Sequence, residues 1–262
     1  MKLSAEQLER YSRQMVIKDF GHSGQENILK SKILVIGAGG LGSPATLYLA
    51  AAGVGTLGIV DGDKVSLSNL HRQVLHYTSD LNKAKVSSAQ EKINKLNPEV
   101  KVIPYQEMVT LKNILKIIND YDFILDCTDN FTAKFLINDA CLKAQKPFSH
   151  GGILDFSGQT LTVIPLKTAC YRCIFIKPPP EDILPLKSQR GVLGPAAGSI
   201  GIMQAIEALK FILNQGTLLT NRLLTFDALQ SSFREIPVKK NKNCPACGED
   251  SSVKNLLLSA EK

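Results

Sequence analysis

The chain has 262 residues, of which 44% are hydrophobic and 21% charged, the composition of a soluble globular protein that can bury a sizeable core. The first ten residues are polar, and the most apolar stretch, residues 194–213, contains Glu207 and Lys210, so we expect a buried helix there, no membrane span and a cytoplasmic protein. The net charge is +7, but the basic residues are scattered, which is typical of a solvated surface and gives little support for a nucleic-acid partner.

Apolar strands alternate with helices through the first half of the chain. Strands are predicted at residues 32–36, 56–61, 100–104, 122–128 and 146–149, and helices at residues 41–52, 84–96, 111–119 and 131–144. After Gly151 the pattern changes, and residues 159–164, 222–226 and 233–238 alternate as antiparallel strands do. The sequence therefore predicts an α/β fold with a Rossmann-like, doubly wound and largely parallel sheet, extended by antiparallel strands in the C-terminal half.

A glycine turn lies between the first strand and the first of these helices. Its sequence, Gly37-Ala-Gly-Gly-Leu-Gly42, fits G-x-G-x-x-G in the context that this motif requires. A helix that starts there offers free N–H groups and a positive dipole to a phosphate. Asp61 ends the second strand, where its carboxylate can accept ribose hydroxyls. The motif indicates a bound nucleotide, and a tight turn without a ligand is the alternative.

Further charges follow at the edge where open α/β sheets bind ligands. Arg72 lies in a loop, Lys85 begins a helix and Asp129 follows the fourth strand. A dehydrogenase binds a pyrophosphate largely through backbone N–H groups, whereas added cations and a carboxylate suit a triphosphate with Mg²⁺. Singly, each residue is typical of a solvated surface. Together they favour ATP over NAD.

Four of the six cysteines form two C-x-x-C pairs, Cys170 with Cys173 and Cys244 with Cys247. In a chain without a signal peptide, two such pairs indicate a four-thiolate zinc site, which leaves no open position and is therefore structural. A redox pair and unconnected thiols are the alternatives. Cys127 and Cys141 lie in an apolar strand and a helix, where we expect small core residues.

The combination of motifs resembles the ThiF/MoeB/HesA family, the bacterial relatives of the ubiquitin-activating (E1) enzymes. The resemblance runs from about residue 8 to residue 248. The motifs that carry it are Arg10-Tyr-Ser-Arg13-Gln14, Gly37-Ala-Gly-Gly-Leu-Gly42, Asp61-Gly-Asp63, Leu67-Ser-Asn-Leu-His-Arg-Gln73, Asp126-Cys-Thr-Asp-Asn130, Cys170-Tyr-Arg-Cys173 and Gly191-Val-Leu-Gly-Pro195. It implies a homodimeric adenylyltransferase with a structural zinc. Its substrate would be the C-terminal glycine of a small ubiquitin-like sulfur carrier with a Gly-Gly end, in molybdopterin or thiamine synthesis.

The resemblance also implies roles for individual residues. Asp129 would be the Mg²⁺-linked catalytic aspartate, and Arg13 would reach the γ-phosphate of the ATP in the partner subunit. The predicted nucleotide site consists of Gly37, Gly39, Gly40, Gly42, Asp61, Asp63, Asn69, Arg72, Gln73, Lys85 and Asp129. A carrier's terminal carboxylate is ionised at neutral pH and needs no general base. The protein has to align it with the α-phosphate and stabilise charge as pyrophosphate leaves.

The whole chain, residues 1–262, is predicted to be one E1-like adenylation domain. Residues 30–150 would form its nucleotide-binding half and residues 151–250 its carrier-binding and zinc half. Several relatives carry a cysteine shortly before the segment that begins at Gly191, but residues 178–190 contain none, and Lys187 lies near the expected place. No rhodanese-like extension follows. We therefore expect adenylation followed by sulfur delivery from an external donor, without a covalent thioester step.

Two alternatives remain open. The first keeps the chemistry but changes the acceptor to a peptide terminus or a carboxylate on a modified tRNA. The second is an NAD-binding oxidoreductase or redox sensor, which would require a hydride-handling residue that the sequence does not reveal.

Overall fold

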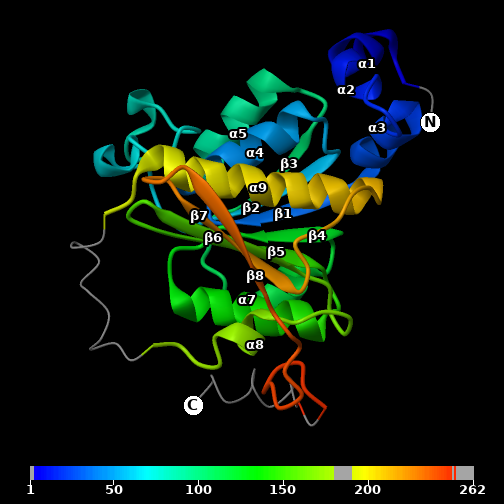
Figure 1. Ribbon diagram of the computed structural model, residues 1–262. Coiled ribbons are helices and arrows are strands. Elements are labelled where there is room, and N and C mark those ends of the chain that lie inside the picture. The colour runs from blue at the N-terminus through cyan, green and yellow to red at the C-terminus, as the bar shows by residue number, and fades with distance from the viewer. Residues whose placement is uncertain (1–2, 180–190, 250, 252–262) are drawn as a thin grey trace.

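Eight strands form one continuous sheet at the centre of the computed structural model, which describes residues 3–179, 191–249 and 251 (Figure 1). Their order across the sheet is β3-β2-β1-β4-β5-β6-β7-β8. The strands are β1 (Lys32–Ile36), β2 (Thr56–Val60), β3 (Lys101–Tyr105), β4 (Phe123–Asp126), β5 (Phe148–Leu154), β6 (Ser157–Val163), β7 (Arg222–Asp227) and β8 (Ser232–Pro237). The first five strands are parallel, and β6, β7 and β8 extend the sheet antiparallel. The predicted fold class is confirmed.

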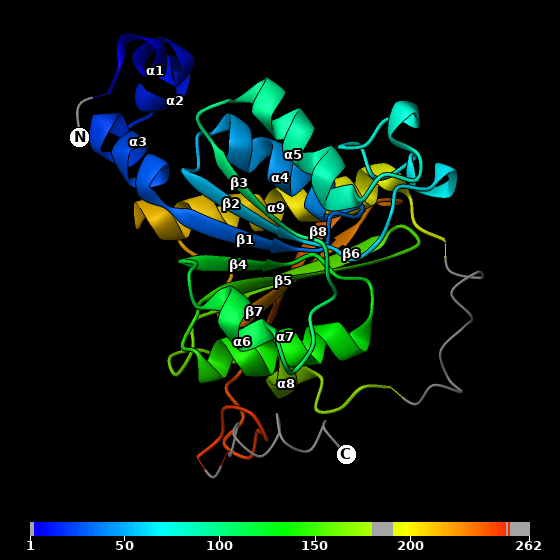
Figure 2. The same cartoon turned by 180° about the vertical axis from the view of Figure 1, so that it is seen from behind.

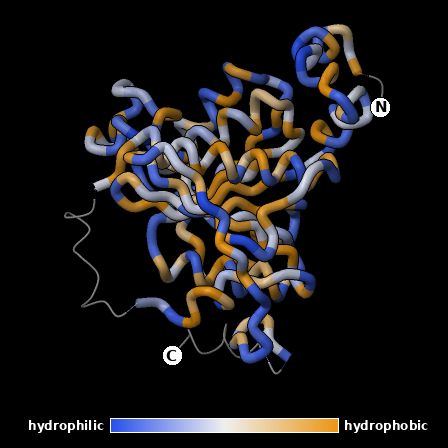
Figure 3. Tube along the Cα trace, viewed as in Figure 1, coloured by the Kyte–Doolittle hydropathy of each residue, from blue (hydrophilic) through white to orange (hydrophobic). Residues whose placement is uncertain are grey.

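Helices cover both faces of the sheet (Figure 2). The α-helices are α1 (Ala5–Arg10), α2 (Ser12–Met15), α3 (Gly21–Lys30), α4 (Gly42–Ala51), α5 (Lys85–Leu96), α6 (Ile114–Ile118), α7 (Phe131–Lys143), α8 (Tyr171–Ile174) and α9 (Gly194–Leu213). Side chains alternate along β1, so that Ile33 and Val35 join the core beneath α4 and α9, whereas Leu34 and Ile36 join the core beneath α6 and α7. The central strands accordingly form the most hydrophobic part of the trace (Figure 3).

Helix α9 is the predicted buried helix. Among the described residues it is the one helix long and apolar enough, by length and composition alone, to cross a membrane. In this fold it lies across the sheet and packs against α4, β5 and β6, and the carboxylate of its Glu207 accepts hydrogen bonds from the Thr162 hydroxyl and the Leu219 N–H, both at 2.6 Å. It therefore belongs to the core.

The structure differs from the predicted elements in several bounds and in four helices. The helix predicted at residues 111–119 is shorter, Ile114–Ile118, and the strand predicted at residues 122–128 is Phe123–Asp126; α8 was not predicted. The fifth strand, predicted to start at residues 146–149, starts at Phe148 and continues to Leu154, because all seven of its residues pair with β6 in an antiparallel hairpin. Helices α1 to α3 were not predicted. Helix α1 begins with a capping box, in which Ser4 and Gln7 exchange hydrogen bonds of 2.9 and 3.1 Å, so the Ser-x-x-Gln spacing was the available signal.

Candidate functional site

The site lies where the sheet reverses its strand order. The chain leaves β1 towards β2 and β3 on one side, while β4 and β5 lie on the other, and such a switch point is where open α/β sheets bind ligands. A pocket of about 1020 Å³ opens at the carboxyl ends of these strands. The glycine turn, Asp61 and Asp129 follow the ends of these strands and line the pocket, as the sequence predicts.

Two positions of the turn between β1 and α4, Gly37 and Gly42, require glycine. Gly37 has a φ of +101°, and a Cβ there would lie 2.7 Å from the carbonyl oxygen of Cys127. A Cβ on Gly42 would lie 1.8 Å from the carbonyl oxygen of Gly37. Gly37, Gly39 and Gly40 line the pocket, whereas Gly42 lies behind the turn and begins α4. The turn therefore brings the backbone and the N-terminus of α4 close to a ligand.

Asp61 holds the turn in place. Its two carboxylate oxygens accept hydrogen bonds from the N–H groups of Ala38 at 2.8 Å and Asp63 at 2.9 Å. Lys85 lies beside it, with Nζ 3.7 Å from Asp61 Oδ1 and 2.9 Å from Asp63 Oδ2. The sequence predicted a ribose acceptor at Asp61, and the structure adds a second task, because the same carboxylate fixes the glycine turn. Lys85 is a nearly buried cation on the pocket wall.

The loop after β2 carries the next polar groups. The stem of Arg72 passes beside Gly40, and its Nη1 donates to the carbonyl of Ser68 at 3.0 Å. Gln73 is only 4% exposed, lines the pocket, and its Oε1 has no hydrogen-bond partner within the described residues. An orphaned buried acceptor fits a ligand hydroxyl or amino group. Asn69 does not line the pocket; its carbonyl accepts the N–H groups of Arg72 and Gln73 and shapes the loop.

Asp129 is exposed at the pocket rim just beyond β4. Its carboxylate makes no hydrogen bond or ion pair with any described residue, while the neighbouring Asn130 caps α7 by accepting the N–H of Ala133 at 2.8 Å. A fixed backbone with a free carboxylate suits a metal ligand. Arg13, by contrast, is exposed on α2 and does not line this pocket. Helix α2 lies beyond the amino end of β1 (Figure 2).

The pocket continues beyond the predicted nucleotide residues. The part of its wall formed by the antiparallel strands is called the second lobe below. It includes Ser157 and Gln159 from β6, Thr225 and Phe226 from β7, and Arg234 from β8. Sequence reasoning also missed Lys134 and His150, which line the pocket and contact the buried carboxylate of Asp126. Lys134 interrupts an apolar stretch of α7 and His150 an apolar strand. The register of β4 and β5 brings His150 to Asp126, and the packing of α7 on the sheet brings Lys134 there.

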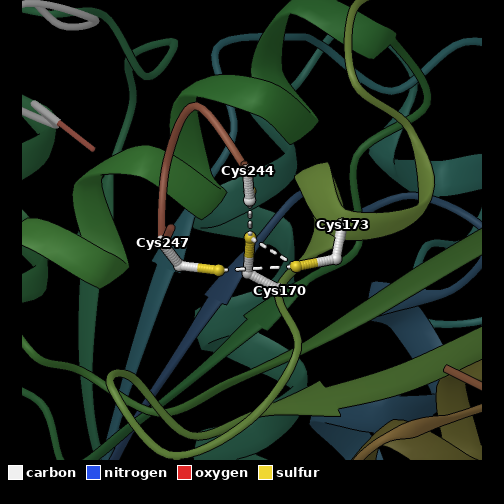
Figure 4. Close-up of side chains that lie close together, drawn as sticks. All are labelled: Cys170, Cys173, Cys244 and Cys247. Atoms are coloured by element: carbon white, nitrogen blue, oxygen red, sulfur yellow. Dashed lines mark hydrogen bonds between the residues drawn. The ribbon is translucent and has the colours of Figure 1, made fainter. Parts of the chain in front are cut away.

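The four predicted cysteines meet although the two pairs lie far apart in the sequence (Figure 4). Their sulfur atoms all lie within 4.8 Å of one another, with Cys170–Cys244 at 3.6 Å and Cys173–Cys247 at 3.4 Å. Four thiolates on one zinc are about 3.8 Å apart, as bond lengths of about 2.3 Å in a tetrahedron require. The donors therefore fit a structural zinc. The other two cysteines, Cys127 and Cys141, are buried core residues.

The fold and the site together define a nucleotide-binding enzyme of the Rossmann-like class. It has a glycine turn at a switch point, acids and cations around one pocket, and a separate four-cysteine cluster. Residues 11–246 match the ThiF family. The chain belongs to this family and is an ATP-using adenylyltransferase.

Three relatives show how far the likeness extends. The chain is 42% identical to the sulfur carrier protein adenylyltransferase of Thermus thermophilus, over 98% of this chain and 97% of that protein. It is 42% identical to the SAMP-activating enzyme E1 of Haloferax volcanii, over 95% and 92%. It is 43% identical to the adenylyltransferase and sulfurtransferase MOCS3 of Culex quinquefasciatus, of which it spans 59%. The solved structure of Escherichia coli MccB with MccA-N7isoASN has the same fold, with a TM-score of 0.82 at 22% identity over 95% of this chain and 76% of that one.

Proposed function

We propose that this protein uses ATP to adenylate the C-terminal glycine carboxylate of a small ubiquitin-like sulfur carrier and releases pyrophosphate. The observation that carries the proposal is that one pocket is lined by both halves of the chain. The first half supplies the glycine turn, Lys85 and Asp129, and the second half supplies polar side chains of β6 to β8. A triphosphate and an extended peptide end can therefore meet in one cavity. The names of the relatives from Thermus and Haloferax support a carrier protein as the acceptor.

The chain's own residues would act by binding and positioning. Lys85 and Arg72 bring positive charge to the phosphates, and the turn offers backbone N–H groups. Asp129 would hold the metal, and Mg²⁺, when bound, would neutralise charge that develops on the phosphates. The acceptor carboxylate is already ionised, so alignment with the α-phosphate and stabilisation of the leaving pyrophosphate supply the catalysis. We assign the nucleotide role to all eleven residues that the sequence predicts, although Gly42 and Asn69 would act by shaping the turn and the loop.

The proposal is tested by ATP–pyrophosphate exchange with purified carrier proteins, with a peptide ending in Gly-Gly as the competing acceptor. Asp129→Ala should lower exchange by at least about a hundredfold, because the metal loses its organising carboxylate. The matched control is Asp120→Ala, which removes an exposed aspartate away from the pocket and should leave exchange unchanged. Exchange within a few-fold of wild type in Asp129→Ala would refute the role of Asp129, and exchange with the peptide alone would change the acceptor.

We further propose a cytoplasmic homodimer in which Arg13 completes the partner's site, and an external sulfur donor. Support for the first comes from the position of Arg13, which is exposed and far from its own pocket. The absence of cysteine from residues 178–190 supports an external donor. The structure of residues 180–190, and with it the place of Lys187, lies outside the described residues. We treat residues 1–262 as one adenylation domain with the nucleotide and carrier halves given above.

A further inference from the structure

A buried cluster of three ionisable side chains lies at the wall of the pocket, which two of them, Lys134 and His150, line. It consists of Asp126 at the end of β4, Lys134 in the first turn of α7 and His150 in β5. Their side chains are 0%, 8% and 1% exposed. Asp126 and His150 are register partners on adjacent parallel strands, which is why their side chains meet. Buried charges are costly and need a compensating arrangement.

The carboxylate of Asp126 gathers donors from several elements. His150 Nδ1 donates to Oδ2 at 2.9 Å, and Lys134 Nζ lies 3.3 Å from Oδ2 and 3.4 Å from Oδ1. Oδ1 also accepts the backbone N–H of Thr128 at 3.1 Å and its hydroxyl at 2.6 Å. Lys134 further donates to the carbonyl of Gly151 at 2.5 Å. One carboxylate thus ties β4, β5 and α7 to the turn that ends at Asp129.

The electrostatic surroundings set the protonation states of Asp126 and His150. Burial alone would raise the pKa of Asp126, but the charge of Lys134 and the hydrogen bond from His150 hold it at about 2. Burial, with the charge of Lys134, lowers the pKa of His150 to about 4 against the opposing effect of Asp126. At neutral pH the cluster is an ion pair with a neutral imidazole. Since Nδ1 carries the proton, Nε2 is an acceptor, and it faces the Gln159 amide at 3.5 Å in the second lobe.

The imidazole is held from a second side by a residue of α8, next to the cysteine cluster. The ring of Tyr171 packs on His150 with centroids 4.5 Å apart, and also on Phe135 at 5.1 Å. Tyr171 lies between Cys170 and Cys173 on α8. A helix of four residues depends on its anchors, so the cysteine cluster would fix the position of Tyr171 against His150.

We infer that the Asp126–Lys134–His150 cluster is the positioning element of the pocket, which sets the direction of Asp129 through Thr128 and links that direction to the second lobe through His150. None of the three side chains needs to touch the nucleotide. They act because the Asp129 carboxylate makes no hydrogen bond or ion pair with described residues, so its position follows from the turn before it. The inference rests on the proposed role of Asp129 in metal binding.

The test compares the affinity for ATP with and without Mg²⁺ by titration calorimetry, which needs no carrier. His150→Phe keeps a ring against Tyr171 but cannot donate to Asp126. His150→Asn places an amide N–H near the position of Nδ1 and restores the donor. Mg²⁺ should raise the ATP affinity of the wild type, and in His150→Phe this increase should be roughly tenfold smaller. A factor of this size is the effect of one charge-assisted hydrogen bond. Affinity without Mg²⁺ should stay within about twofold, and His150→Asn should recover most of the gain.

A second pair of variants tests the same inference if His150→Phe does not fold. Thr128→Val removes the hydroxyl that donates to Asp126, and Thr128→Ser retains it, so the first should lose the gain and the second should keep it. The inference is overturned if folded His150→Phe and Thr128→Val keep the gain, or if affinity falls equally with and without Mg²⁺, which marks a purely structural role. A wild-type protein without any gain would refute the role of Asp129 and the inference together, so the two failures are distinguishable.

Discussion

Replacement of Lys134 by methionine tests the electrostatics of the buried cluster directly. Methionine has a similar length and packs in the same apolar surroundings, but it removes the positive charge that lies 3.3 Å from Asp126 Oδ2. The Asp126 carboxylate remains, fully buried, with His150 and Thr128 as its donors. The substitution therefore leaves a buried anion without its counter-charge.

The expected loss follows from the cost of breaking a buried pair. Removing one partner of such a pair lowers the free energy of unfolding by about 3–5 kcal/mol. Because hydrogen bonds to Asp126 survive, we expect a loss of about 3 kcal/mol for Lys134→Met. Folded domains are stable by about 5–15 kcal/mol, so the variant should still fold. Lys116→Met, at an exposed position on α6, is the matched control and should change the free energy of unfolding by less than about 0.5 kcal/mol.

The pH dependence gives the sign of the effect. In the wild type the pKa of Asp126 is lowered from 3.8 to about 2, so its contribution is present above the unfolded value and is lost as pH falls through about 2. Without Lys134 burial dominates, and the pKa of Asp126 should rise above its unfolded value. Protonation then favours the folded variant, and the stability gap should be largest at neutral pH and shrink towards acid.

Urea unfolding of both proteins between about pH 7 and pH 4, with zinc present, measures this gap. A gap under about 1 kcal/mol at neutral pH, or one that does not change with pH, would refute the reasoning, because Asp126 would then not be a buried anion that depends on Lys134.

Two further predictions concern the metal and the partner subunit. Cys244→Ser should lower zinc content and melting temperature together, because binding energy at such a site is folding energy; elemental analysis without zinc in wild-type protein prepared free of chelator would remove the site. Arg13→Ala and Asp129→Ala should each be inactive alone but regain activity when co-expressed, since one of the two sites in a mixed dimer carries neither change. Verified mixed dimers without recovery would place Arg13 in its own subunit's site.

The strands and the glycine turn were predictable because their signals are local. Hydrophobic runs such as residues 32–36 become β1 with the predicted bounds, and the glycines of the turn follow from backbone sterics. Asp61, Lys85 and Asp129 were placed at the pocket because parallel strands end at one edge of the sheet. The four cysteines were predicted from their spacing, which is a chemical signal rather than a structural one.

The buried cluster could not be predicted from the sequence. Asp126 and His150 become neighbours through the register of β4 and β5, and a single sequence does not reveal a register. Lys134 is indistinguishable in sequence from a solvated lysine. The same limit applies to the second task of Asp61, since its bond to the Ala38 N–H depends on where the turn lies in three dimensions. What was missed is therefore the long-range hydrogen bonding of buried polar groups.

The four-cysteine cluster has a topological consequence. Cys170 and Cys244 are 74 positions apart, and the chain between them includes α9, β7 and β8. A cross-link that closes a loop of this length lowers the entropy of the unfolded chain by the equivalent of about 4 kcal/mol, and zinc–thiolate bonds constrain the chain in the same way. Helix α9 and the last two strands of the sheet, β7 and β8, are thus enclosed in a metal-closed ring. A single backbone break inside that ring would leave both pieces tethered for as long as the metal stays bound.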